Sequence, residues 1–196
     1  MRRLFILVIL TALTGCASNQ RQAILPKMLS YVPVSNKNQL ATASPDTLQK
    51  IFESGLQKLS LDDLYAMNHF RVKMIEATRE NCMVILEDRT ISSARKEQAL
   101  LSLSNEEYDQ YTRIIAKAVT LGANYEAKVP PRPNKNEFTK AFDIALGAPT
   151  SGIIPTYLVG IKNLEQDQCW VLHKGLRYAD EKRNRIAEII VKYMGM

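Results

Sequence analysis

Apolar residues recur at steps of three and four along most of the chain, with charged residues between them. The clearest stripe lies between Ser60 and Glu87 and consists of Leu61, Tyr65, Val72, Ile75, Cys82 and Leu86. This period fits one face of an α-helix, so it predicts a single long helix over residues 61–86. Ser60, followed three residues later by Asp63, marks its start. Because Cys82 falls on the stripe, we expect its side chain to point into the core.

Start and stop residues predict further helices. Ser44-Pro45 supplies an N-cap and a first-turn proline for a helix to about residue 58. Ser104 and Glu107 form a capping box for a helix to about residue 121, with Gly122 as its expected C-cap. Other helices are expected over about residues 93–101, 136–146 and 180–194.

The segment 150–178 allows two interpretations. Two strand-like apolar runs flank a polar stretch and could pair as a β-hairpin at about 155–174. The spacing of Cys169, Leu172 and Leu176 fits a helix equally well, and an isolated hairpin is marginally stable. We therefore favour helix over this segment. The expected fold is mainly α, a single compact multi-helix domain behind a flexible N-terminal tether, with an α+β fold carrying the small hairpin as the alternative.

Two stretches lack a helical period. Residues 16–43 are rich in polar residues with two prolines and scattered apolar positions, which predicts a tether; a flexible chain of this length spans about 30 Å. Its apolar side chains could instead dock on the domain and shorten that reach. Residues 128–134, KVPPRPN, favour extended polyproline II structure. We interpret them as a hinge between a first helical subdomain and the rest of the domain, which spans residues 44–196.

The formal charge is +6, and removal of Arg2 and Arg3 would lower it to about +4. Basic residues alternate with acidic ones, as in Asp180-Glu181-Lys182-Arg183, and do not gather in one block. This distribution is typical of solvated helix faces, so no nucleic-acid partner is expected.

The first sixteen residues carry the most specific motif in the chain. Arg2 and Arg3 precede an apolar run from Leu4 to Leu10, and Leu13-Thr14-Gly15-Cys16 follows. The arrangement resembles the lipobox of bacterial lipoprotein signal peptides. This resemblance implies diacylglyceryl transfer to the Cys16 thiol, cleavage after residue 15, and acylation of the freed amine with a fatty acid such as palmitate. Because the apolar run is too short to span a bilayer, we interpret residues 1–15 as a signal peptide.

The same resemblance carries an expectation about location. Ala17, and not Asp, follows Cys16. Under the sorting rule of enteric-type lipoproteins, this favours the outer membrane, and we expect the domain to face the periplasm. No later segment is long and apolar enough to cross a membrane, so attachment would depend on the acyl chains at Cys16.

Lipid on Cys16 would leave Cys82 and Cys169 as the remaining thiols. Two cysteines in an oxidising compartment favour a disulfide bond. It would close a loop of about 90 residues, for which the loop-entropy model gives an upper figure of roughly 4–5 kcal/mol. Two separate buried thiols are the alternative.

Established catalytic and metal-binding motifs are not found, so no metal or cofactor is expected. HExxH, CxxC, GxSxG and phosphate-binding glycine loops do not occur, and neither His69 nor His173 has a second histidine three or four residues away. Ser151, in the small-residue loop 147–152, could act as a nucleophile with His173 as its base. Trp170, the single tryptophan, is expected to lie in the core.

Three functional hypotheses follow, and the sequence favours a protein that is not an enzyme. The first is a lipid-anchored, periplasm-facing accessory or assembly factor with an envelope protein partner. The second is a binding module for an anionic envelope ligand such as lipopolysaccharide or peptidoglycan. An envelope hydrolase using Ser151 and His173 is the least favoured.

Overall fold

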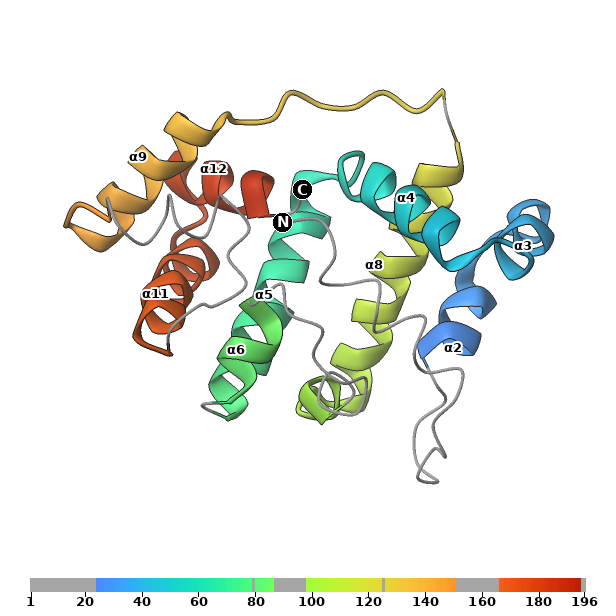
Figure 1. Cartoon of the computed structure of the whole chain (residues 1–196), viewed down its shortest axis with the longest axis horizontal. Helices are drawn as coiled ribbons and strands as arrows, with labels where there is room; N and C mark the ends of the chain where they lie inside the picture. Colours follow the sequence, from blue (N-terminus) through green and yellow to red (C-terminus); the bar gives the residue numbers. More distant parts are fainter. Residues whose placement is uncertain (1–23, 79, 87–97, 125, 151–165, 195–196) are drawn as a thin grey trace.

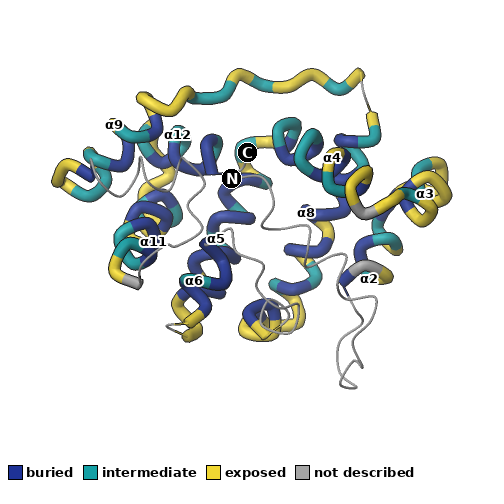
Figure 2. The backbone as a smooth tube through the Cα atoms, viewed as in Figure 1, coloured by how far each residue is buried: buried dark blue, intermediate teal, exposed yellow. Residues whose placement is uncertain are grey.

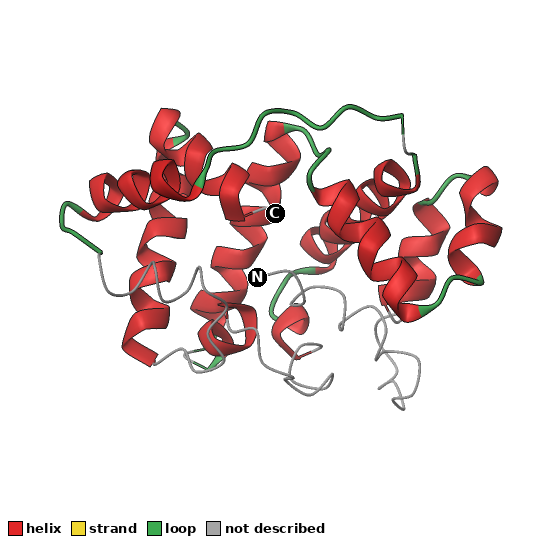
Figure 3. Ribbon diagram, turned by 45° about the horizontal axis from the view of Figure 1, so that its top comes forward, coloured by secondary structure: helices red, strands yellow, loops and turns green. Residues whose placement is uncertain are grey.

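The computed structural model describes residues 24–78, 80–86, 98–124, 126–150 and 166–194. Within these ranges the regular structure is helical and no strand occurs, as Figure 3 shows. The helices are α2 (Ile24–Tyr31), α3 (Val34–Ala41), α4 (Pro45–Leu56), α5 (Leu61–Ala77), α6 (Asn81–Leu86), α8 (Asn105–Ala123), α9 (Lys135–Leu146), α11 (Gln166–Lys182) and α12 (Arg185–Met194). The mainly α fold class is thus confirmed.

Local capping explains where the long helices start. The Ser44 hydroxyl accepts a hydrogen bond from the Thr47 N–H at the start of α4. Capping boxes open the next three long helices along the chain, in which the capping residue and the third helical residue are Ser60 and Asp63 for α5, Ser104 and Glu107 for α8, and Asn134 and Glu137 for α9. In each box two N–H groups that the helix leaves free gain an acceptor. Gly147 ends α9 in the left-handed conformation, with φ of 65°.

The helices form two groups that share one continuous hydrophobic core (Figures 1 and 2). We call α2, α3, α4 and α8 the α8 group. We call α5, α6, α9, α11 and α12 the α11 group. Helix α5 of the α11 group connects the two groups, because it contacts α8 as well as α6, α11 and α12. The core is therefore built from residues far apart in the sequence.

In the α8 group, α4 and α8 cross with their backbones in contact. A Cβ atom added to Gly55 would lie 1.6 Å from the carbonyl oxygen of Ala118, and one added to Gly122 would lie 1.7 Å from that of Ile51. Each glycine therefore admits the backbone of the other helix. The prediction that Gly122 is a C-cap is wrong, since α8 continues through it and ends at Ala123.

The predicted single helix over residues 61–86 is also wrong, because it is broken after Ala77. Thr78 is extended, with φ of −147° and ψ of 148°. Its hydroxyl accepts from the N–H of Asn81, while the Asn81 side-chain amide donates to the Met74 carbonyl. These bonds satisfy backbone groups at both ends of the break, and α6 starts in a new direction.

A third correction concerns the last helix, which was expected to start near residue 180. The preceding helix, α11, continues to Lys182, and Arg183 then adopts a φ of 42°. The side-chain oxygen of Asn184 accepts from the N–H of Ala187, 3.0 Å away, and so caps α12. A polar left-handed residue and a capping asparagine thus separate two helices that the sequence pattern had merged.

The segment expected as a tether contains two helices, so residues 24–41 are not part of a flexible linker. The side chains of Met28 and Leu40 are 0% and 2% exposed. The alternative that apolar residues of this segment dock on the domain is the one observed.

The hinge expected at residues 128–134 is extended, as its prolines predict, and runs across the top of the molecule in Figure 1. It does not separate two independent subdomains, since α5 and α6 precede it and pack with helices that follow it. Arg132 holds the segment in place. Its guanidinium donates to the carbonyl of Leu56 at 2.8 Å and to that of Lys192 at 2.9 Å.

The ambiguous segment 150–178 is helical from Gln166 onward, where α11 begins. Cys169 and Leu172, which the hairpin alternative placed in its second strand, are on this helix. The favoured helix prediction is confirmed over this part. Residues 151–165, with the first strand of that alternative, lie outside the described residues.

Candidate functional site

Cys82 and Cys169 form a disulfide bond between α6 and α11. Their sulfur atoms are bonded, their Cα atoms are 6.0 Å apart, and both side chains are fully buried. The pairing favoured from the sequence is therefore present, and the inward orientation expected for Cys82 is observed. It closes the loop between residues separated by 87 positions. The break at Thr78 contributes to this geometry, because it sets the direction of α6.

His173 lies one helical turn after Cys169 on α11 and is 4% exposed. Its Nε2 is 3.4 Å from a carboxylate oxygen of Glu76 on α5, too long for a good hydrogen bond. The ring meets that of Trp170 edge to face, with centroids 5.0 Å apart. Burial lowers the pKa of His173, although the Glu76 charge partly opposes this effect.

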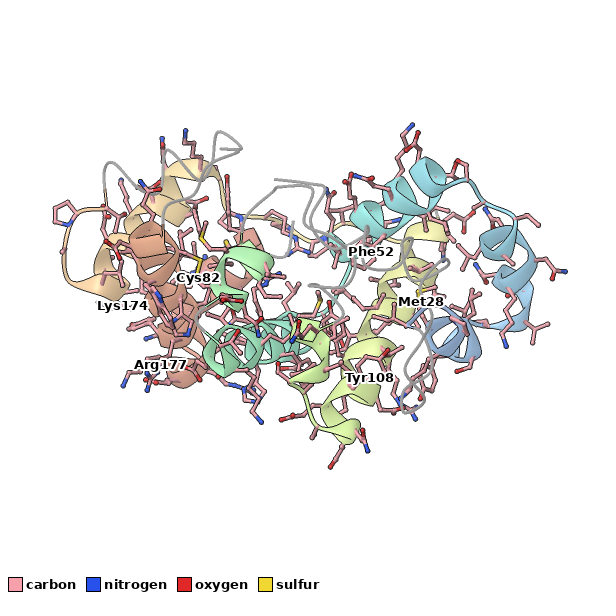
Figure 4. The ribbon with its side chains drawn as sticks, turned by 60° about the horizontal axis from the view of Figure 1, so that its bottom comes forward. Met28, Phe52, Cys82, Tyr108, Lys174 and Arg177 are labelled. Atoms are coloured by element: carbon pink, nitrogen blue, oxygen red, sulfur yellow. A yellow bond between two sulfur atoms is a disulfide. The ribbon has the colours of Figure 1, made fainter. Side chains whose placement is uncertain are left out.

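The outer edge of this junction is charged. Arg177, one turn beyond His173, lies 3.8 Å from Glu76 and donates to Glu181 at 2.9 Å. In Figure 4, Lys174 and Arg177 lie at the same end of the molecule as Cys82, away from Met28, Phe52 and Tyr108. Sequence reasoning found Cys82, Cys169, His173 and Trp170 but missed Glu76 and Arg177. Arg177 continues the four-residue spacing from Cys169 and His173, which could have revealed it.

The other sequence-derived candidates take structural positions. The Nδ1 atom of His69 lies 3.0 Å from a carboxylate oxygen of Asp180, and this pair connects α5 to α11. Trp170 is partly buried and contacts His173, so it lies at the edge of the core. Ser151 lies outside the described residues, as do Cys16 and Ala17.

The loop that leads to Ser151 starts in a fixed place. Thr150 is 5% exposed, and both its N–H and its hydroxyl donate to one carboxylate oxygen of Asp143, at 2.7 and 2.6 Å. These bonds fasten the loop to α9 after Gly147.

A second polar cluster, missed from the sequence, joins α2 to α8. Asp109 accepts hydrogen bonds from the Tyr31 hydroxyl and from Arg113 Nε at 2.8 Å, and Lys27 Nζ lies 2.9 Å from it. The Arg113 guanidinium also lies over the Tyr31 ring, 4.3 Å from its centroid. The Tyr31 hydroxyl, Arg113 and Lys27 together hold the pKa of Asp109 far below its usual range. Because Lys27 and Tyr31 are four residues apart, a helix prediction for this segment would have placed them on one face.

A third set of contacts joins the two helix groups through α5 and α8. Lys117 of α8 lies 2.5 Å from Asp63, the capping-box acid of α5. In return Lys73 of α5 contacts Glu107, the capping-box acid of α8. Lys73, followed by the Ser104 backbone N–H, lowers the pKa of Glu107 to about 2. Each capping carboxylate thus serves its own helix and binds a cation of the other one.

Within the described residues, no group of three or more His, Cys, Asp or Glu side chains is placed to hold a metal ion. Across that same part of the chain, no helix has the length and apolar character needed to cross a membrane. The chain matches no protein-family model, no curated protein and no solved structure.

Proposed function

We propose that the protein is an envelope lipoprotein that is attached to the outer membrane by lipid on Cys16. In this proposal its helical domain faces the periplasm and acts as a non-catalytic accessory or assembly factor for an envelope protein partner. The observation that carries the proposal is that export chemistry accounts for all three cysteines of the chain. Cys16 is the cysteine of the stretch Leu13-Thr14-Gly15-Cys16 that resembles a lipobox, and Cys82 is bonded to Cys169.

The disulfide supports export independently of the lipobox. Structural disulfides form and persist in oxidising compartments such as the bacterial periplasm and are rare in the cytosol. Both sulfur atoms are buried, and the bond joins α6 to α11 within the core. A structural disulfide and a lipobox in one chain favour the same side of the inner membrane.

The non-catalytic role is supported by the contacts that the titratable side chains make. The pair His69–Asp180 connects α5 to α11, and the Asp109 cluster connects α2 to α8. These contacts use titratable groups to hold helices in place. A rigid helical body of this kind suits the binding of a protein partner.

The first experiment follows Cys16 in a Gram-negative host supplied with an alkyne-labelled fatty acid. Full-length protein is expected to take up the label and to fractionate with the outer membrane, while Cys16→Ser remains an unlabelled precursor. The matched control is Cys82→Ala/Cys169→Ala, which retains the lipobox and should still be labelled. A full-length protein without label would contradict the proposal.

The second experiment identifies the partner by crosslinking in the same cells, followed by detergent extraction and mass spectrometry. One reproducible envelope protein in near-equal amount is the expected result. Recovery of lipopolysaccharide or peptidoglycan alone would contradict the accessory role and favour a ligand-binding module. A turnover activity that disappears in His173→Ala, with folding intact, would contradict the non-catalytic role.

A further inference from the structure

The outer face of α3 lies at the end of the molecule that α2 and α3 form (Figure 1). We propose that this face rests on the phosphate headgroups of the membrane that holds the lipid anchor, with Val34 in the interfacial layer. The inference rests on the lipid attachment proposed above and adds which side of the domain faces the bilayer.

The distance between the anchor and the domain is limited by chain length. The first described helix begins at Ile24, eight positions after Cys16. Even a fully extended chain spans at most about 3.3–3.6 Å per residue, so Ile24 cannot lie more than roughly 29 Å from the Cα of Cys16. The domain is therefore held close to the headgroups.

The point where this short connection enters the domain is firmly attached. Ile24 and Met28 are 5% and 0% exposed, and Figure 4 shows Met28 near α8 together with Tyr108. The Asp109 cluster holds α2 to α8 through Lys27, in the middle of α2, and through Tyr31 at its end. Because α2 cannot swing freely, the side of the domain that carries α2 and α3 stays nearest the anchor.

The charge of this end suits an anionic surface. Residues 17–45 contain Arg21, Lys27 and Lys37 and no acidic residue, and the first acid of the chain is Asp46. Lys27 shares Asp109 with Arg113, so this cluster keeps one surplus positive charge. Basic residues close to a membrane are attracted to anionic phosphates within about a Debye length.

The outer face of α3 combines an apolar side chain with a cation. Val34 is 81% exposed, the highest value among the large apolar side chains described as exposed. Lys37 and Asn38 follow it at three and four residues, on the same helical face, while Leu40 points into the core. A small apolar group beside a lysine whose stem can extend toward phosphate fits the interfacial layer of a bilayer.

The opposite end of the molecule supplies a matched control. Ile144 of α9 is 61% exposed, and α9 lies far from α3 in Figure 1. It is also apolar and on a helix surface, but Asp143 precedes it, and α9 lies at the other end of the molecule from α2, which is the first described helix after Cys16. If exposure alone determined contact with lipid, Val34 and Ile144 should both contact it. The inference predicts that Val34 contacts lipid and Ile144 does not.

The test places a photo-crosslinking amino acid at position 34 or 144 of the full-length protein in intact cells. Mass spectrometry then measures phospholipid adducts, and an alkyne fatty acid reports lipidation in the same sample. We expect phospholipid adducts at position 34, in about fivefold or greater excess over position 144. Lys37→Gln should lower the yield at 34 about fivefold, the effect expected for one basic residue at an anionic surface, whereas Lys140→Gln on α9 should not.

The outcomes separate this inference from the proposed function. A lipidated protein with equal phospholipid yields at the two positions would overturn the inference and leave the anchor proposal standing. A lipidated protein that crosslinks from position 34 to a protein would assign the α3 face to a partner and also overturn it. Absence of the fatty-acid label would overturn both.

Discussion

Each helix group contains one close contact between two of its helices, and the two contacts differ in kind. In the α8 group, α4 meets α8 where Gly55 and Gly122 leave no side chain between the backbones. In the α11 group, Cys82 and Cys169 join α6 to α11 by a covalent bond. The first contact depends on shape and is insensitive to redox conditions. The second acts mainly on the unfolded chain, because a disulfide limits its conformational entropy. The contact in the α8 group therefore does not depend on redox conditions, whereas the contact in the α11 group is covalent only where the two cysteines are oxidised.

The largest expected effect comes from breaking the covalent contact. Cys82→Ala/Cys169→Ala should lower the free energy of unfolding by about 4 kcal/mol, since the bond closes a long loop. Urea unfolding followed by circular dichroism measures this loss. A reductant should produce a similar loss in the natural protein and none in the double variant. Two free thiols in the unfolded, unreduced natural protein would show that the bond is absent.

The second effect breaks the shape-dependent contact. Gly122→Ala should cost about 3 kcal/mol, because its Cβ would lie on the Ile51 carbonyl oxygen and force α4 and α8 apart. The sign is informative, since Gly→Ala at an open helical position stabilises by about 1 kcal/mol. Urea unfolding under oxidising and reducing conditions should give the same loss.

Gly55→Ala and Ser54→Ala sharpen this comparison. Gly55→Ala should behave like Gly122→Ala, and the double glycine variant should cost less than the two single changes together, because they disturb one contact. Ser54 is a partly exposed neighbour on α4, so Ser54→Ala should leave stability nearly unchanged. An increase in stability in either glycine variant would exclude close backbone contact.

The third effect concerns a residue that connects the two groups. Arg132 donates to the last turn of α4 through Leu56 and to the last turn of α12 through Lys192. A cation also suits the partial negative charge of helix C-termini. Arg132→Ala should lower the free energy of unfolding by about 2 kcal/mol, the scale of hydrogen bonds from a charged donor. Thermal unfolding measures it.

Two variants serve as controls for Arg132. Arg132→Lys retains the charge but not the planar fork that reaches two carbonyls, so its loss should be intermediate. Lys128→Ala, an exposed change in the same extended segment, should have little effect. Equal stability of Arg132→Ala and the natural protein would mean that the segment behaves as the free hinge expected from its prolines.

The parts of the fold that the sequence predicted are those with local causes. Ser60 with Asp63 and Ser104 with Glu107 are three residues apart, and each pair sets its helix start without help from the rest of the chain. The break at Thr78 was missed because the apolar stripe continues across it to Cys82 and Leu86, and a periodic pattern alone does not mark a change of direction.

The remaining errors come from contacts distant in the sequence. Gly122 suggested a helix end because glycine is common there. The backbone of Ile51, which approaches it closely, is on another helix. Helices α2 and α3 are eight residues each, too short to be stable without the core against which they pack. At the disulfide junction, helical spacing brought Cys169 and His173 together. Glu76 reaches them only through the packing of α5 against α11.

The smallest expected effect is the pH dependence of the contact between Glu107 and Lys73, which connects the two groups. The pKa of Glu107 is lowered from 4.5 to about 2, first by Lys73 and then by the Ser104 N–H. A carboxyl whose pKa is lower in the folded state stabilises the fold above its unfolded pKa. This contribution is lost as the pH falls from about 4.5 toward 2. Since the Lys73 side chain is 46% exposed, solvent screening reduces it to about 1 kcal/mol.

Glu107→Gln isolates this contribution, because glutamine can retain the capping box while removing the charge. The variant should be less stable than the natural protein near pH 6, and the difference should shrink as the pH falls toward 2. Urea unfolding at several pH values measures it. Glu106 is an exposed neighbour in the same first turn, so the free energy of unfolding of Glu106→Gln should follow that of the natural protein at every pH. If the free energy of unfolding of Glu107→Gln also follows that of the natural protein at every pH, then Lys73 does not join α5 to α8 in solution. The connection between the two groups would then depend on Arg132, on the Asp63–Lys117 pair and on their shared core.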